Sequence, residues 1–418
     1  MAINAMSASP DTNFLIEERS IGSVPYKQSS PNDSYDDLDY TFNFDVAFVG
    51  ASEFTRIASQ HIDFVVDQQY TLVATGTVAD PTLTVWESTV RVFTDTDTVF
   101  QTRFGHTGNT LGPIDVYFAL GGVAPVGGEQ VATLQLGEVS DPMDFEAGDY
   151  VITITNANEP TQVLYSSSPE SIFATVNMIV TVFDGDANDT GQYVVRGLGL
   201  TGGIATFQDP LNRPTIEFVH AAMDLHAGIG DGTSDIYDDV DLTSLVVSGH
   251  AYRDLTAAFP VAAGILNSNY TPSGETSVVS LENSVALALD SHYRLTAVGG
   301  NGEYFGVNTF LNRRSIDTAA KLLLLQTTLN YDLSDLYIVD ADTTIDDQSP
   351  FRVLVSRVAT PVSFLAAGSY DLYITDFGEK VPLAGPYRLD LALGDVVDLT
   401  VFDTADPAVL EIVEHAIP

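Results

Sequence analysis

The chain repeats one set of short strands four times, and this repeat constrains the fold more than any single residue does. Each copy opens on a hydrophobic strand that ends in a polar residue, and a second strand then begins near a matching residue. The polar residues are Asn4, His106, His220 and Gln326, and their matches are Asn13, Asp115, Asp235 and Asp335. A repeat of roughly 100–120 residues is the size of a whole domain and not of a solenoid unit. The sequence therefore predicts a string of four similar domains.

Domain boundaries are expected where strand patterns give way to polar or proline-bearing stretches, namely TDTDT, QDPLNRP and NRRSIDT. The predicted domains are residues 1–97, 98–211, 212–319 and 320–418. These connections are short, and none is a long Gly/Ser-rich or Pro-rich linker. We therefore expect neighbouring domains to pack end to end as a fairly stiff rod. The third copy departs from the others by a glycine-rich insert, HAGIGDG, at residues 226–232.

Alternation of apolar and polar residues with a period of two dominates the chain. In TFNFDVAF (residues 41–48), Phe42, Phe44 and Val46 fall on one face. Turn residues interrupt such runs every ~8–12 residues, which is typical of antiparallel sandwiches or barrels. Brief helical pieces are expected only at residues 52–59 and 314–321. The predicted fold is all-β, built of tandem antiparallel β-sandwiches.

Charge and composition exclude several classes of partner and chemistry. The chain has 16 basic and 57 acidic residues, giving a formal net charge of −41, which repels nucleic acid and anionic membranes and attracts cations. Cysteine is absent, so disulfides and thiolate chemistry are excluded. No apolar run reaches the ~18 residues of a membrane-spanning helix. Residues 1–9 show no signal-peptide pattern, so the expected mature or trimmed form carries no export signal of its own.

Several segments resemble the DUF4397 domain, a family of unknown function found in exported bacterial and archaeal proteins. The resemblance rests on the opening INAMSASPDTNFLIEERSIGSVPYKQSS (residues 3–30), on RFGHTG…PIDVYFALGG (103–122) and on IEFVHAAMD (216–224). The first copy departs from the pattern, since Asn13 stands where Asp is usual, and the third carries the glycine-rich insert. The resemblance implies immunoglobulin-like sandwiches, export and a surface or envelope setting. It implies no reaction.

The recurrent polar residues invite a catalytic interpretation, but their identities argue against it. Asn, His and Gln share hydrogen-bonding capacity and not an acid–base range, so a general base would not be replaced by an amide. We expect each side chain to tie its strand end to an adjacent turn. The matching Asn13, Asp115, Asp235 and Asp335 are expected to cap turns by accepting backbone N–H groups.

The acidic loop DGDANDTG, at residues 184–191, is the best chemical signal in the chain. It places Asp184, Asp186, Asn188 and Thr190 on alternate positions, which resembles the first half of a calcium loop. The bidentate Glu that completes an EF-hand is missing, since residue 195 is Val. A solvated turn is the alternative. The candidate cofactor is therefore Ca²⁺ at these four residues.

Three functions compete for such a chain. The preferred one is a non-enzymatic extracellular or cell-surface structural or adhesive protein, which self-associates into a filament or layer with residues 1–10 as a candidate donor strand. The alternative to donation is that this segment pairs inside its own domain. The second function is an array of carbohydrate- or ligand-binding modules that contact cell-surface or matrix polysaccharide, and it requires exposed aromatic rings beside polar groups. The third is a hydrolase, for which no acid–base or nucleophile constellation can be named.

Overall fold

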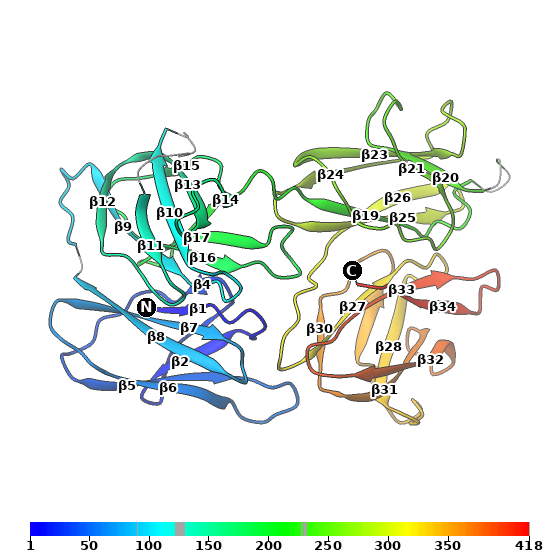
Figure 1. Ribbon diagram of the computed structural model, residues 1–418. Coiled ribbons are helices and arrows are strands. Elements are labelled where there is room, and N and C mark those ends of the chain that lie inside the picture. The colour runs from blue at the N-terminus through cyan, green and yellow to red at the C-terminus, as the bar shows by residue number, and fades with distance from the viewer. Residues whose placement is uncertain (90, 122–129, 227–228, 230–231, 418) are drawn as a thin grey trace. The chain divides into compact units, whose positions relative to one another are not determined.

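The computed structural model describes residues 1–417 except 90, 122–129, 227–228 and 230–231. Part of the glycine-rich insert therefore lies outside the described residues. The described chain consists of strands, turns and loops, so the all-β prediction is confirmed (Figure 1). It contains no helix with the length and apolarity needed to cross a membrane. Two compact units are present, Met1–Asn212 and Arg213–Pro418.

The first unit contains four sheets, two in each predicted domain. The strands are β1 (Ala2–Asn4), β2 (Thr12–Ile16), β3 (Arg19–Val24), β4 (Gln28–Ser29), β5 (Asp39–Val46), β6 (Thr55–Asp63), β7 (Gln68–Gly76), β8 (Pro81–Thr89), β9 (Val99–His106), β10 (Ile114–Leu120), β11 (Gln130–Leu134), β12 (Met143–Glu146), β13 (Gly148–Asn156), β14 (Val163–Ser166), β15 (Glu170–Ile172), β16 (Asn177–Asp184), β17 (Tyr193–Gly199) and β18 (Ile204–Phe207). The sheet orders are β4-β1-β7-β8 and β3-β2-β5-β6, then β12-β9-β16-β17-β18 and β11-β10-β13-β14, with β15 also paired to β13.

The second unit also contains four sheets. Its strands are β19 (Thr215–His220), β20 (Ser234–Tyr237), β21 (Leu245–His250), β22 (Phe259–Pro260), β23 (Gly264–Pro272), β24 (Leu281–Leu287), β25 (His292–Gly300), β26 (Glu303–Phe310), β27 (Ala320–Gln326), β28 (Leu333–Asp340), β29 (Arg352–Val355), β30 (Ser363–Leu365), β31 (Gly368–Asp376), β32 (Pro382–Leu391), β33 (Val396–Asp403) and β34 (Leu410–Glu414). The sheet orders are β22-β19-β25-β26 and β21-β20-β23-β24, then β30-β27-β33-β34 and β29-β28-β31-β32.

The same strand order recurs four times, matching the repeat in the sequence. In each copy the opening strand pairs in parallel with the closing apolar strand, as β1 does with β7 and β27 with β33, while the other pairings are antiparallel. The sandwiches are therefore mixed and not purely antiparallel, because the chain passes through the second sheet before it returns beside its first strand. The predicted boundaries at residues 97, 211 and 319 fall between these strand sets.

The two expected helical pieces are wrong. Residues 55–63 form β6, which pairs along its length with β5, and the segment at 314–321 runs into β27, which pairs with β33. These short polar segments have no strong intrinsic preference for helix over strand, and pairing with a neighbouring strand gives their backbone N–H and C=O groups hydrogen-bond partners. The expected donor strand also has a partner in its own domain, because β1 pairs with β4 and β7 and is fully buried.

In the first unit the two domains contact each other through sheet faces. One apolar cluster combines Tyr26 and Trp86 of the first domain with Ile179 and Phe183 of the second. The Trp86 indole N–H donates to the Gly137 carbonyl at 2.7 Å. The short connections predicted end-to-end packing, and within this unit that prediction is wrong. Contact between the sheet faces removes their apolar residues from water, which stabilises face-to-face packing more than a contact at the linker would.

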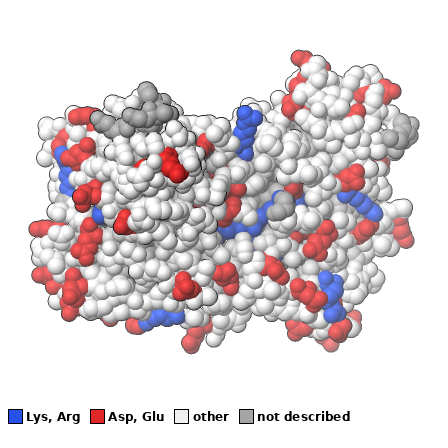
Figure 2. Space-filling view, viewed as in Figure 1, with Lys and Arg blue, Asp and Glu red and all other residues white. Residues whose placement is uncertain are grey.

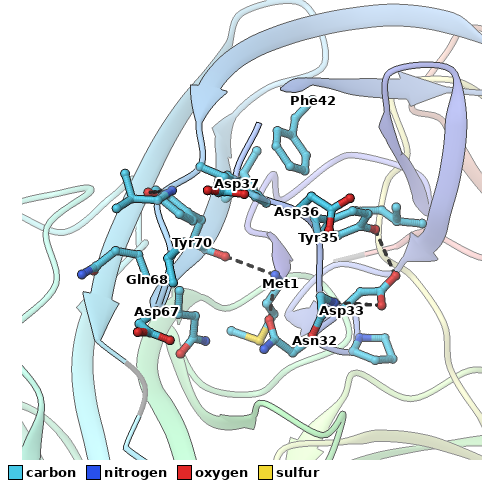
Figure 3. A pocket seen from close by; sticks show the side chains of 18 residues that line it. Met1, Asn32, Asp33, Tyr35, Asp36, Asp37, Phe42, Asp67, Gln68 and Tyr70 are labelled. Atoms are coloured by element: carbon cyan, nitrogen blue, oxygen red, sulfur yellow. Dashed lines mark hydrogen bonds between the residues drawn. The ribbon is translucent and has the colours of Figure 1, made fainter. Parts of the chain in front are cut away.

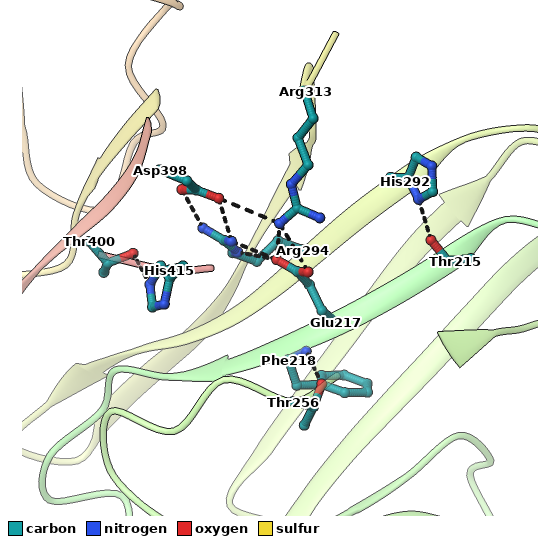
Figure 4. A network of polar contacts seen from close by, with 10 residues as sticks. All are labelled: Thr215, Glu217, Phe218, Thr256, His292, Arg294, Arg313, Asp398, Thr400 and His415. Carbon is teal, nitrogen blue, oxygen red and sulfur yellow. Dashed lines mark hydrogen bonds and ion pairs between the residues drawn. The ribbon is translucent and has the colours of Figure 1, made fainter. Parts of the chain in front are cut away.

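In the second unit a buried ion network joins the third and fourth domains (Figure 4). Arg294 of β25 binds Asp398 of β33 through two nitrogens at 2.8 and 2.6 Å, and its Nε donates to Glu217 of β19 at 2.7 Å. Arg313 donates to Glu217 at 2.9 Å. All four side chains are 3–4% exposed, so two positive and two negative charges balance inside the interface. Such a network is costly to break because the remaining charges stay buried.

Gly105→Ala should destabilise the first unit. A Cβ at Gly105 would lie 2.6 Å from the Trp86 ring and 3.0 Å from the Thr181 hydroxyl, so the ring must shift. We expect a loss of about 1–3 kcal/mol, as for other overpacked sites. Urea unfolding followed by the fluorescence of Trp86, the one tryptophan, measures it. Gly203→Ala is the control, because a Cβ there meets nothing within 4 Å. Equal stability of the two variants would contradict the interface.

Asp398→Asn should destabilise the second unit by about 3–5 kcal/mol, because Arg294 and Arg313 would then share one carboxylate in a buried site. Urea unfolding followed by tyrosine fluorescence measures the change. Asp342→Asn is the matched control. Its partner Arg388 and its own side chain are 45% and 87% exposed, so loss of that pair should cost about 1 kcal/mol or less. A small effect at Asp398 would show that the network contributes nothing to stability.

Candidate functional site

The recurrent polar residues lie where the sequence analysis expected, at the ends of β1, β9, β19 and β27. Three of them tie the strand end to an adjacent turn. The bonds are Asn4 Nδ2 to the Ser9 hydroxyl at 3.0 Å, His106 Nε2 to the Gly112 carbonyl at 2.9 Å, and Gln326 Nε2 to the Tyr331 carbonyl at 2.9 Å. His220 is the exception, since neither ring nitrogen has a partner in another of the described residues. The expected bond between the strand-end side chain and the adjacent turn is therefore present in three of the four copies.

The matching residues on the second strand act largely as turn caps. The bonds are from the Asn158 N–H to Asp115 at 2.7 Å, from the Gly274 N–H to Asp235 at 2.9 Å, from the Gly378 N–H to Asp335 at 2.9 Å, and from the Ser20 hydroxyl to Asn13 at 2.6 Å. Backbone N–H groups lower the pKa of Asp235 against the opposing effect of its burial, which favours the charged carboxylate that a cap requires.

Of the predicted calcium residues, Asp184 ends β16 and the other three follow it, and the carboxylates of Asp184 and Asp186 face different partners. Asp184 is buried and accepts the Asn109 N–H at 2.7 Å and the Thr110 N–H at 3.1 Å. It therefore organises the turn after β9. Asn188 donates its backbone N–H to Asp186 at 2.8 Å, and Thr190 is half-buried farther along the loop.

A lysine ammonium lies at the centre of this loop. Lys27 of the first domain contacts Asp186 at 3.0 Å and also pairs with Asp189. Burial raises the pKa of Asp189, while the Lys27 charge acts in the opposite direction. The Tyr26 hydroxyl beside it donates to the Asp184 carbonyl at 2.8 Å. An intramolecular cation thus joins the loop to the neighbouring domain, so calcium at this loop would compete with Lys27.

Lys27 was not among the predicted site residues, although the sequence carries a signal for it. The doublet Tyr26–Lys27 recurs in the third copy as Tyr252–Arg253, and the Tyr252 hydroxyl likewise donates to a carbonyl, that of Asp403, at 2.8 Å. Both basic residues have positive φ, 63° and 74°, at the same turn. The repeated aromatic–basic pair therefore marks the contact between paired domains.

A pocket of about 410 Å³ opens at one end of the first domain (Figure 3). One wall is the segment 31–37 after β4, and the other is the connection from β6 to β7 together with the start of β7. Figure 3 shows Asp67 and Gln68 on one side and Asp33 and Tyr35 on the other. This pocket was not predictable from local sequence patterns, because its two walls are some 30 residues apart in the chain. The acid-rich run PNDSYDD, residues 31–37, was its one local signal.

Aromatic rings form the inner part of the pocket. Phe64 stacks on Tyr70 with ring centroids 4.6 Å apart and an interplanar angle of 7°. Tyr35 lies edge-on to Phe64 at 6.1 Å, and Phe42 is buried beneath. Tyr35 and Phe64 are half-buried, so parts of their rings remain open to a ligand. An apolar floor of this kind favours the flat C–H faces of a ligand.

Four carboxylates surround these rings, and three of them are uncommitted. Asp33 accepts the Tyr35 hydroxyl at 3.0 Å; burial and then this carboxylate raise the pKa of Tyr35 to about 12. Asp36, Asp37 and Asp67 are exposed at the pocket, and their carboxylates have no hydrogen-bond partner in the part of the chain that the structure describes. The net charge of −41 adds to the negative field around them, and acidic side chains are spread over the face drawn in Figure 2.

A second acidic group lies on the outer face of the sheet containing β5 and β6. Asp39, His61 and Asp63 place one ligand atom each within 4.8 Å of one another, and all three are exposed. His61 contacts Asp63 at 3.2 Å. Exposed groups of this kind are common without an ion, so this trio is a weak feature beside the pocket.

Comparisons with known proteins add little. No family model matches the chain, and no curated protein matches it. Among solved structures, the Bacillus anthracis TIE protein aligns over 94% of this chain and 75% of its own at 9% identity, with a TM-score of 0.16. A product complex of SpuA, a multi-modular glycogen-degrading pneumococcal virulence factor, aligns over 91% of this chain and 37% of its own at 9% identity, with a TM-score of 0.15. At these TM-scores neither likeness bears on fold or function, and the resemblance to DUF4397 stays a prediction.

Calcium binding at Asp184, Asp186, Asn188 and Thr190 also stays a prediction, and Lys27 gives it a sharp test. Bound calcium should raise the melting temperature, with a stabilisation of ~2.7 kcal/mol when its concentration is 100 times Kd. Lys27→Gln removes the competing ammonium and should lower Kd for calcium. Lys380→Gln, in the fourth domain, is the charge-matched control. A melting temperature that calcium leaves unchanged in all three proteins, at fixed ionic strength, would reject the site.

Proposed function

We propose that this protein is a non-enzymatic binding protein of the cell surface or extracellular medium, which adheres to polysaccharide through the pocket of its first domain. The observation that supports this most is the combination of half-buried rings and uncommitted carboxylates in one pocket of about 410 Å³. The binding-module interpretation of the sequence required exposed aromatic rings beside polar groups on one sandwich face, and here the rings are half-buried in a pocket instead. The paired sandwiches supply a rigid support for it.

The chemistry of the pocket restricts its ligand. Ionised Asp side chains only accept hydrogen bonds, so Asp36, Asp37 and Asp67 require a ligand rich in O–H or N–H donors. The ring floor prefers flat C–H surfaces. A sugar presents both, with hydroxyl donors at its rim and C–H groups on its face. An amino sugar adds a positive charge that the acidic field attracts.

A structural role in a filament or layer is the second candidate, and exposed strand edges favour it. In the first domain β6 and β8 each have a sheet partner on one side only, and both are nine residues long. Unpaired backbone groups on such edges can accept a strand from another chain. The net charge of −41 opposes this association at low salt, so assembly would strengthen as salt screens the repulsion.

Removing the uncommitted carboxylates should weaken polysaccharide binding. We expect Asp37→Asn combined with Asp67→Asn to reduce affinity at least tenfold, because each lost hydrogen bond to a charged group is worth about 1.5–3 kcal/mol. Co-sedimentation of the full chain with insoluble chitin, cellulose and peptidoglycan measures binding. Asp346→Asn with Asp347→Asn makes the same charge change on exposed residues of the fourth domain and should leave binding intact. The proposal would be contradicted if the unmodified chain bound none of the three polymers, or if both double variants lost binding to the same extent.

A further inference from the structure

The third domain replaces a satisfied hydrogen-bond cluster with three histidines. In the first domain the Asn4 amide at the end of β1 donates to the Ser9 hydroxyl at 3.0 Å and to the Val24 carbonyl at 2.9 Å. In the third domain the strand-end residue is His220, and His226 and His250 follow it in the chain. This is the one strand end of the four whose polar side chain has no partner in another described residue.

The correspondence between the two domains rests on a shared backbone bond. The N–H of Lys27 donates to the Asn4 carbonyl at 2.9 Å, and the N–H of Arg253 donates to the His220 carbonyl at 2.7 Å. Val24 and His250 each end a strand, β3 or β21, three residues before that basic residue. His250 therefore stands where the first domain has an apolar valine.

All three imidazoles are buried and carry nitrogens without a hydrogen-bond partner. His220 and His226 are 1% exposed and His250 is 3% exposed. Both nitrogens of His220, Nε2 of His226 and Nδ1 of His250 are unpartnered, and so is the hydroxyl of Ser234, which is 0% exposed. Five such atoms at one strand end are costly unless something binds them, because buried polar groups are almost always satisfied.

The remaining nitrogens are held in the way that metal-ligating histidines are held. His250 Nε2 lies 3.0 Å from the Asp254 carbonyl, which can only accept, so this nitrogen carries the proton and Nδ1 keeps its lone pair. His226 Nδ1 lies 3.4 Å from the Ser280 hydroxyl, which leaves Nε2 as the unpartnered nitrogen. A second contact that fixes the far nitrogen is typical of metal-binding histidines.

Two of the rings are close together, and burial favours the neutral form of all three. The centroids of His220 and His250 are 5.9 Å apart. Burial lowers the pKa of all three histidines, and for His220 the neighbouring His250 and His226 lower the pKa further, to about 3. At neutral pH the three rings therefore offer lone pairs rather than positive charges.

We propose that His220, His226 and His250 bind a divalent transition metal ion, with Zn²⁺ or Co²⁺ as the class of ion that three imidazoles suit. Three neutral imidazoles and a water complete a four-coordinate site. In the described chain only Asp39, His61 and Asp63 already place three ligand atoms within 4.8 Å of one another, so binding at the histidines requires the rings to rotate inward. This site is independent of the polysaccharide pocket, which lies in the first domain.

The test uses the full chain carrying His61→Asn, which removes the imidazole of the exposed trio. Titration with Co²⁺ should give the visible absorption of a tetrahedral ion, and Zn²⁺ should raise the melting temperature of the third domain. Lowering the pH should weaken binding, because protons compete for the imidazole lone pairs. The absence of both the absorption and the thermal shift would overturn the proposal.

The first repeat supplies fold-compatible variants at two of the positions, namely His220→Asn and His250→Val, and His226→Asn removes the third imidazole while keeping a polar side chain. Each substitution should lower the affinity for Co²⁺ by at least roughly 10–100-fold, because removing even a residue that only hydrogen-bonds to a metal ligand lowers metal affinity by that factor. His106→Asn, at the same position of the second domain, should leave binding unchanged. Nitrogen NMR of the imidazoles in the His61→Asn protein gives a readout without further substitution: Zn²⁺ should shift the ring signals of the three histidines, and shifts confined to other histidines would overturn the site.

Discussion

Each domain depends on one parallel pairing between its opening and closing strands. β1 with β7 and β27 with β33 join segments that are some 70 residues apart, and the whole second sheet of the domain lies between them in sequence. This pairing can form only after the second sheet has brought the chain back, so it closes the domain as a unit. It also fixes the end of the opening strand, where the recurrent polar residue sits.

Several of the scarce positive charges lie where domains meet. Lys27 joins the first and second domains, and Arg253, Arg294 and Arg313 join the third and fourth. In a chain of 16 basic and 57 acidic residues, this leaves the outside strongly acidic (Figure 2). The buried cations neutralise carboxylates that would otherwise repel each other across the interface, while the exposed acids keep the surface hydrated. The same acid-rich composition therefore supports both the pairing of domains and the solubility of the protein.

The sequence predicted the repeated elements well and the contacts between them poorly. Alternation in segments such as 41–48, and the recurrence of Asn4, His106, His220 and Gln326, sufficed for four all-β domains, because strand patterns and turn residues are local. The helices expected at 52–59 and 314–321 were wrong because pairing across a sheet decided those segments.

The candidate sites show the same limit. The pocket depends on Phe64 and Tyr70 meeting the 31–37 segment, and the loop at Asp186 depends on Lys27 from another domain. Spacing along one segment cannot reveal a partner more than 150 residues away. The aspartate caps were predictable because an Asp beside a turn acts locally, whatever surrounds it.

The burial of Lys27 has a consequence for the chemistry of the whole surface. Lys27 and Lys321 are 7% and 2% exposed, and the third lysine, Lys380, donates to the carbonyls of Ile345 and Gln348. The folded protein therefore offers reagents that attack primary amines scarcely any free lysine side chain. Acylation of Lys27 therefore requires the first and second domains to separate, so its rate of labelling measures how often that interface opens.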